Sequence, residues 1–120
     1  MIDPQNEDAA VEIRSLARNC HEALLLALLA SGPHHGYQLA LELERKSGGA
    51  FRFNHGTLYP ILHKLEQEGL IRGNWLDEKT KRKRKRYSLT DKGHDRLARQ
   101  IEAWRGFFFN FFSVIGEESP

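Results

Sequence analysis

The segment from Lys79 to Arg86 has Lys or Arg at seven of its eight positions and separates two stretches with the composition of β-strands. Strands this close in sequence are expected to pair as a hairpin, with the cations in the connecting loop. The chain carries 18 basic and 16 acidic residues, so without these seven it has 11 against 16, a net charge of −5. A local cationic loop on an acidic body is typical of a protein that binds a polyanion, most often a nucleic-acid backbone. For the run taken alone, a solvated turn or a localisation tract remains the alternative.

The length of 120 residues and a hydrophobic content of 40% predict one globular domain. Residues 1–8 are polar and lack the pattern of a secretory signal, so we expect a flexible tail there. No stretch approaches the ~18 apolar residues of a membrane span. The single cysteine, Cys20, cannot form an internal disulfide. These features predict a cytoplasmic protein that has no membrane partner.

Apolar residues at steps of three and four predict a first helix over about residues 9–30. Its second half is apolar on most sides, through residues such as Leu25, Leu26 and Leu29, and should be the central helix of the core. Its first half, with Ile13 and Leu16, is amphipathic and is expected to serve a partner.

Two further helices are expected after the Ser31-Gly32-Pro33 terminator. The first runs from about Gly36 to Lys46, before a glycine pair. The other follows a short extended piece and is expected to begin near Thr57, because Pro60 is best tolerated in a first turn. Either Asn54 or Thr57 could cap it.

The outer face of this third helix carries polar and aromatic side chains. At ~100° per residue its leucines share one face, leaving Tyr59, His63, Lys64 and Gln67 to point outward. These side chains can bond phosphates or base edges, and a helix that follows a tight helical pair is the element usually placed in the major groove. The other interpretation of an exposed polar face is simple solvation.

Two strands are expected at residues 70–76 and 86–90, on either side of the cationic run. Three helices followed by a hairpin with a basic tip is the layout of a winged helix-turn-helix. The expected fold class is therefore mainly α with a small β-hairpin, a DNA-binding domain with additional N- and C-terminal helices for dimerisation.

A last helix is expected from Asp91 to about Val114, capped by Thr90. Its apolar stripe is accompanied by further apolar residues off the stripe, among them Phe107 and Phe109, so the apolar arc is too wide for packing on one surface. This pattern predicts a partner, most simply a second copy of the chain. The alternative is that some of the rings close the domain's own core.

Four motifs in order carry a resemblance to a known family: Gly36-Tyr37-Gln38-Leu39, Gly56 to Leu62, Leu65 to Ile71, and Arg86 to Thr90 with Gly93. In these the sequence resembles the PadR family of bacterial transcriptional regulators. The resemblance covers about residues 24–97 well and extends more loosely through the single C-terminal helix of the shorter subfamily.

The resemblance implies a homodimeric winged-helix protein, usually a repressor, whose terminal helices build the dimer and whose wings flank double-stranded operator DNA. It implies a tail at 1–8, a winged helix-turn-helix domain at 9–90 with its wing at about 72–90, and a dimerisation helix at 91–116. The residues that we expect to contact DNA are Tyr37, Asn54, His55, Thr57, Tyr59, His63, Lys64, Lys81, Arg82, Lys83, Arg84 and Lys85. Those expected at the dimer interface are Ile13, Leu16, Ile101, Trp104, Phe107, Phe108, Phe111 and Phe112.

A small effector is also expected from the resemblance, since several members of the shorter subfamily bind planar or aromatic molecules through an aromatic residue of the last helix. Trp104, with Phe108 nearby, matches that position. Two counter-arguments stand beside this expectation: a Trp on an apolar stripe is often only core or interface, and the cluster from Phe107 to Phe112 is more aromatic than the family usually shows and could fill a central cavity.

Catalytic and metal-binding patterns are not found in the sequence. It has no Gly-rich phosphate loop, nucleophile elbow or HExxH helix, and its six histidines show no paired ligand spacing. We therefore expect a regulator that is not an enzyme and needs no cofactor or metal. The competing hypothesis is a winged-helix module for protein interaction or for architectural nucleic-acid binding without sequence specificity.

Overall fold

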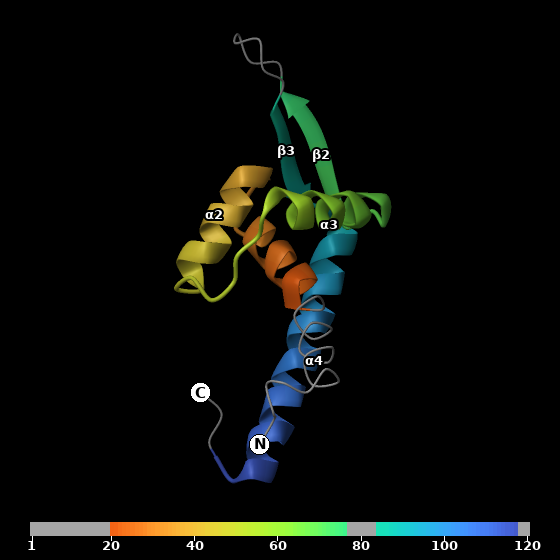
Figure 1. The fold of residues 1–120 in the computed structure, drawn as a ribbon. Helices are drawn as coiled ribbons and strands as arrows, with labels where there is room; N and C mark the ends of the chain where they lie inside the picture. Colours follow the sequence, from red (N-terminus) through yellow and green to blue (C-terminus); the bar gives the residue numbers. More distant parts are fainter. Residues whose placement is uncertain (1–19, 77–83, 118–120) are drawn as a thin grey trace.

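The computed structural model describes residues 20–76 and 84–117, which form a mainly helical body with one small antiparallel sheet (Figure 1). A helix over residues 20–30, called the core helix below, lies at the centre. Four of its leucines, at positions 25, 26, 28 and 29, are buried, which confirms the predicted central helix. The amphipathic segment with Ile13 and Leu16 lies outside the described residues. Within residues 20–76 and 84–117 no helix combines the length and apolar character needed to cross a bilayer.

Helix α2 spans Gly36–Lys46, as the sequence predicts. His35 is its N-cap, and the His35 N–H donates to Gln38 Oε1 at 2.8 Å in a capping box. The helix buries Leu39 and Leu43 against the core helix and α3.

Helix α3 spans His55–Gln67 and begins two residues earlier than predicted. Asn54 is the N-cap, and its Oδ1 accepts the backbone N–H of Thr57 at 2.9 Å. The earlier start places Pro60 inside the helix, where it cannot donate to the carbonyl of Gly56. Burial of the helix's leucines outweighs this loss, because Leu58, Leu62 and Leu65 are each at most 1% exposed.

Strands β2 (Ile71–Leu76) and β3 (Arg84–Leu89) pair antiparallel and form the wing, with Ile71 opposite Leu89 and Leu76 opposite Arg84. The predicted hairpin is therefore confirmed. A third strand, β1 (His34–His35), pairs with the other edge of β3 and gives the order β1-β3-β2. This strand was not predicted, because two residues are too short for a recognisable alternation. Residues 77–83, which include most of the cationic run, lie outside the described part of the chain.

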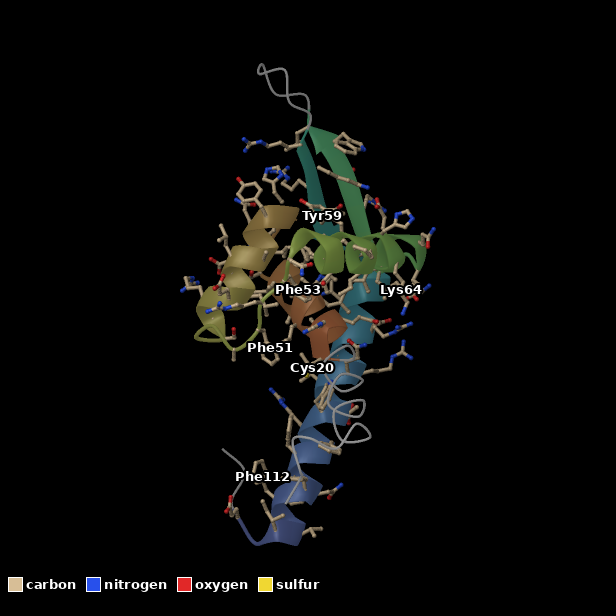
Figure 2. The ribbon with its side chains drawn as sticks, in the orientation of Figure 1. Cys20, Phe51, Phe53, Tyr59, Lys64 and Phe112 are labelled. Carbon is tan, nitrogen blue, oxygen red and sulfur yellow. The ribbon has the colours of Figure 1, made fainter. Side chains whose placement is uncertain are left out.

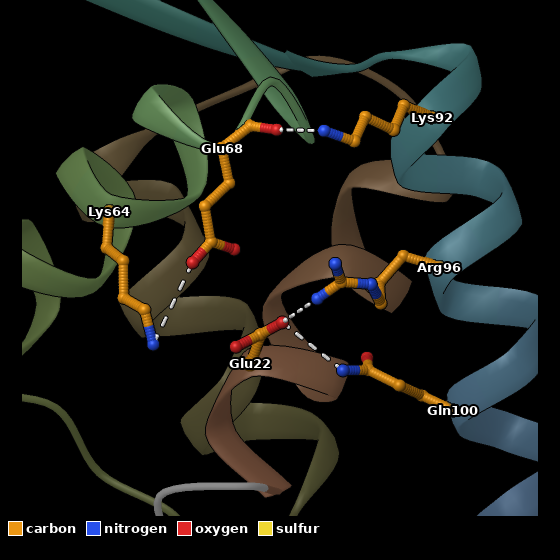
Figure 3. A network of polar contacts seen from close by, with 6 residues as sticks. All are labelled: Glu22, Lys64, Glu68, Lys92, Arg96 and Gln100. Atoms are coloured by element: carbon orange, nitrogen blue, oxygen red, sulfur yellow. Dashed lines mark hydrogen bonds and ion pairs between the residues drawn. The ribbon is translucent and has the colours of Figure 1, made fainter.

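Helix α4 spans Asp91–Ile115 and is capped by Thr90, whose Oγ1 accepts the N–H of Gly93 at 3.0 Å. Its first turns are fixed to the body: Arg96 and Gln100 donate to Glu22 of the core helix at 3.3 and 3.2 Å, and Lys92 donates to the carbonyl of Glu68 at 2.8 Å (Figure 3). Beyond Gln100 the helix projects away from the body, at the end opposite to the wing (Figure 1). The wing and the distal part of α4 therefore lie at opposite ends of the described structure (Figure 1).

Candidate nucleic-acid interface

The N-terminus of α2, the outer face of α3 and the wing border one groove of about 570 Å³. Its lining is rich in aromatic rings and contains two cations: it consists of His35, Gly36, Tyr37, Tyr59, His63, Trp75, Arg84, Lys85 and Tyr87. The groove thus brings together residues from both sides of the wing loop and from two helices.

The outer face of α3 has the composition and exposure that the sequence predicts. Tyr59, His63, Lys64 and Gln67 are exposed, while the opposite face is buried. Figure 2 shows Tyr59 and Lys64 at separate points along α3. Tyr59 lines the groove, whereas Lys64 lies 4.0 Å from Glu68 Oε1 on a solvent-exposed part of the helix. An exposed ion pair of this kind contributes little stability, so Lys64 can leave it for another anion.

The polar side chains at the start of α3 form its N-cap. Asn54 Oδ1 accepts both the backbone N–H and the Oγ1 hydroxyl of Thr57, each at 2.9 Å. Both residues are exposed, but this oxygen of Asn54 and this hydroxyl proton of Thr57 already serve the helix. The side chain of His55 lies outside the described residues.

A stack of planar groups connects α2 to the wing. The rings of His35 and Tyr37 lie 5.9 Å apart and within 4° of parallel, and the guanidinium of Arg84 lies 5.9 Å from the Tyr37 ring. His35 Nδ1 is also within 3.1 Å of the carbonyl oxygen of Lys85. Cation–π contact and stacking therefore place the Arg84 charge beside the N-terminus of α2.

Gly36 is required by the approach of α2 to Tyr59. A Cβ at position 36 would lie 2.9 Å from atoms of the Tyr59 ring, closer than such contacts normally come. The glycine in the first sequence motif thus fits beneath the tyrosine of the second.

Lys85 has an intramolecular partner, which the sequence could not show. Its Nζ lies 2.7 Å from Glu66 Oε1, and the two side chains are only 24% and 28% exposed. The hydrogen bond from Lys85 is the main cause that lowers the pKa of Glu66, and the same bond raises the pKa of Lys85. Among the predicted wing contacts, Arg84 and Lys85 are described, and Lys81, Arg82 and Lys83 lie outside the described residues.

Trp75 lines the groove and Glu66 contacts its residue Lys85, and neither was predicted from the sequence. Glu66 lies 19 residues from Lys85, and no local spacing signals such a pair. Trp75 is 64% exposed on β2, and the ammonium of Lys85 lies 5.6 Å from its ring.

The distal part of α4 carries a cluster of rings that do not close the core. Phe107, Phe108, Phe109 and Phe111 are between 43% and 66% exposed, and Ile101 is 37% exposed. Trp104 is half-buried and stacks on Phe108 at 5.7 Å. In Figure 2, Phe112 lies far along this helix from the body that holds Phe51 and Phe53.

The described residues contain no group of three His, Cys, Asp or Glu side chains that could hold a metal ion. Burial raises the pKa of the Cys20 thiol, which favours its uncharged and less nucleophilic form.

Comparison with known proteins gives two matches in sequence and two in structure. A family model described as the transcriptional regulator PadR-like family matches residues 25–99. The negative transcriptional regulator PadR of Bacillus subtilis is 35% identical over 73 residues, which cover 61% of this chain and 40% of that protein, so the match spans less than half of the regulator's length.

Two solved structures have a fold similar to that of this chain. A transcriptional regulator from Clostridium thermocellum superposes with a TM-score of 0.73 at 25% identity, over 85% of this chain and 95% of that one. The Bacillus subtilis PadR structure in complex with operator DNA gives a TM-score of 0.63 at 30% identity, over 68% of this chain and 45% of the other.

Proposed function

The chain belongs to the PadR-like family of transcriptional regulators, and from that premise we propose that it is a homodimeric repressor that binds operator DNA sequence-specifically and is released by a small effector. The membership makes the chain a regulator rather than an enzyme. The proposal for DNA rests on one observation above all: the outer face of α3, the N-terminus of α2 and Arg84 of the wing border the same groove.

In the proposed complex α3 enters the major groove and the wing lies on the flanking backbone. His63 and Lys64 are exposed on α3 and can donate to base edges. Arg84 and Tyr37 stand together at the start of α2, where a guanidinium, a phenol and a helix N-terminus all favour a phosphate. Lys81, Arg82 and Lys83 lie outside the described residues, and we propose further phosphate contacts for them because they directly precede Arg84 in the sequence.

Selection from a library of random duplexes tests sequence specificity without knowledge of the operator. We expect a consensus, and binding to the selected duplex tighter by at least about a thousandfold than to a shuffled duplex of the same composition at physiological salt. Equal affinity for both duplexes, combined with a steep salt dependence, would refute the specific regulator and support the architectural module. Repression is tested separately, by the fall in transcription from a promoter that contains the selected site.

The dimer is proposed from the exposed rings of α4. Residues two apart differ by ~200° around a helix, so the exposed Asn110 faces away from Phe108 of the apolar stripe. We expect Phe108→Asp to raise the dimer dissociation constant by at least about a hundredfold in sedimentation equilibrium. Asn110→Asp, which adds the same charge at a polar position of the same helix, is the matched control and should leave the dimer intact. Monomeric wild type at micromolar concentration would refute the dimer.

The effector is proposed to be a planar aromatic molecule that stacks near Trp104 and Phe108. In a Trp75→Phe background Trp104 is the single tryptophan, since the chain has two. Titration with planar aromatic compounds should quench its fluorescence and release the selected duplex. If compounds that release DNA leave this fluorescence unchanged, the effector site lies elsewhere.

A further inference from the structure

One carboxylate of α3 contacts both strands of the wing. Glu66 Oε1 lies 2.7 Å from Lys85 Nζ on β3, and Glu66 Oε2 accepts the backbone N–H of Gly73 on β2 at 3.1 Å. Gly73 lies on an edge strand of the sheet, so its N–H gains from Glu66 an acceptor supplied by a helix. The side chain therefore joins α3 to both strands of the wing.

The surroundings of this contact leave little room for another arrangement. A Cβ at position 73 would collide with the Lys85 side chain and would lie 2.9 Å from Glu66 Oε2, so the close approach requires glycine. The Lys85 ammonium lies 5.4 Å from the Tyr87 ring and 5.6 Å from the Trp75 ring. Lys85 is thus held between two rings and a carboxylate, with 24% of its side chain exposed.

We infer that Glu66 is a positioning residue for DNA binding: it fixes the angle of the wing to α3, and Lys85 serves this contact instead of a DNA phosphate. The inference rests on the proposed function, because it matters only if α3 and the wing engage one duplex together. Specific binding requires both elements to reach the duplex at once, and they cannot do so if the angle between them changes.

If Glu66 acted on DNA only through its negative charge, its removal would strengthen binding, whereas a positioning role predicts weaker specific binding. A carboxylate near a phosphate backbone is repulsive, so its neutralisation should tighten binding to any DNA. Glu68→Gln is the matched control for this effect, because Glu68 lies on the turn after α3 and its side chain pairs with Lys64, and among the described residues it has no ion pair with the wing.

In the decisive experiment, Glu66→Gln, Glu68→Gln and wild type are titrated with the selected duplex and its shuffled counterpart. We expect Glu66→Gln to lose about threefold to tenfold in affinity for the selected duplex, the range that a partly buried charge-assisted hydrogen bond can supply. The affinity of Glu66→Gln for the shuffled duplex should stay the same or rise. Glu68→Gln should bind both duplexes as tightly as wild type or more tightly. If Glu66→Gln binds both duplexes as tightly as Glu68→Gln does, the inference is wrong.

A second variant separates positioning from phosphate contact. Lys85→Gln keeps the contact between Glu66 and Gly73, so it is expected to fold even if Glu66→Gln does not. We expect Lys85→Gln to lose part of its preference for the selected over the shuffled duplex. The slope of log affinity against log salt concentration should stay unchanged. A slope reduced by about one unit would instead assign Lys85 to a phosphate.

A measurement without DNA tests the contact of Glu66 separately from the proposed function. Amide hydrogen exchange at Gly73 should be faster in Glu66→Ala than in wild type, because the acceptor of that N–H is removed. Unchanged exchange would overturn the contact itself. If exchange responds but wild type selects no consensus duplex, the proposed function fails while the contact stands.

Discussion

Substitution of Gly93 by alanine should destabilise the protein, because α4 starts in direct contact with the base of the wing. A Cβ at position 93 would collide with the carbonyl oxygen of Leu70 and would lie 2.6 Å from a methyl of Leu89. The Leu70 carbonyl cannot easily move, since it accepts the N–H of Thr90 at 3.1 Å and the Thr90 hydroxyl at 3.0 Å. The first turn of α4 must therefore shift.

The size of the stability loss in Gly93→Ala follows from two opposing effects. Forcing an extra methyl group into a packed site costs about 1–3 kcal/mol. Alanine recovers at most about 1 kcal/mol of helix propensity over glycine, and less in a first turn. The net loss is about 1–2 kcal/mol, which lowers the melting temperature of a chain of this length by about 4–8 °C.

Gly106 on the same helix is the matched control, because a Cβ there meets nothing within 4 Å. Gly106→Ala should raise stability by about 0.5–1 kcal/mol through propensity alone. Thermal unfolding followed by circular dichroism, at one protein concentration for all variants, measures both changes. A Gly93→Ala protein that melts at or above the wild-type temperature would refute the reasoning about the Leu70 carbonyl.

Three further predictions concern the interface. Neutralising Lys83 and Arg84 together should weaken binding to all DNA and flatten the salt slope by roughly one unit for each phosphate that is no longer bound, and an unchanged slope would show that these cations do not touch DNA. His63→Ala or Lys64→Ala should alter the selected consensus more than the affinity for shuffled DNA, and an identical consensus would limit this face of α3 to backbone contacts. The pKa of Glu66 is lowered below its ordinary 4.5 in the folded state, so the stability that its carboxylate contributes is present above that value and lost as the pH falls through the folded pKa. Urea unfolding should accordingly show a constant difference between wild type and Glu66→Gln at neutral pH that shrinks in acid, and a difference independent of pH would contradict the ion pair.

The helices and the wing were predictable because their signals are local. Periodicity and glycine stops identified α2 with its observed bounds, and the capping role of Thr90 identified the start of α4. The start of α3 was less predictable, since the Asn54 cap and buried leucines outweigh the preference of Pro60 for a first turn. Strand β1 was missed because its two residues become a strand only by pairing with β3.

The candidate interface also contains features that could be predicted from the sequence and features that could not. Exposure of the polar face of α3 follows from helical spacing, so Tyr59, His63 and Lys64 could be named in advance. The role of Lys85 could not, because a run of seven cations in eight residues gives each the same local character. Lys85 differs from the other cations of the run in its tertiary contact, because its ammonium pairs with Glu66 of α3.

The sequence by itself determined the elements, their order and the position of the cationic run between two strands. These depend on spacing, caps and turns within a few residues. The tertiary structure decided that Lys85, one cation of this run, is held within the protein by Glu66. That contact joins α3 to β3, and its two residues are 19 positions apart, so no local pattern in the sequence signals it.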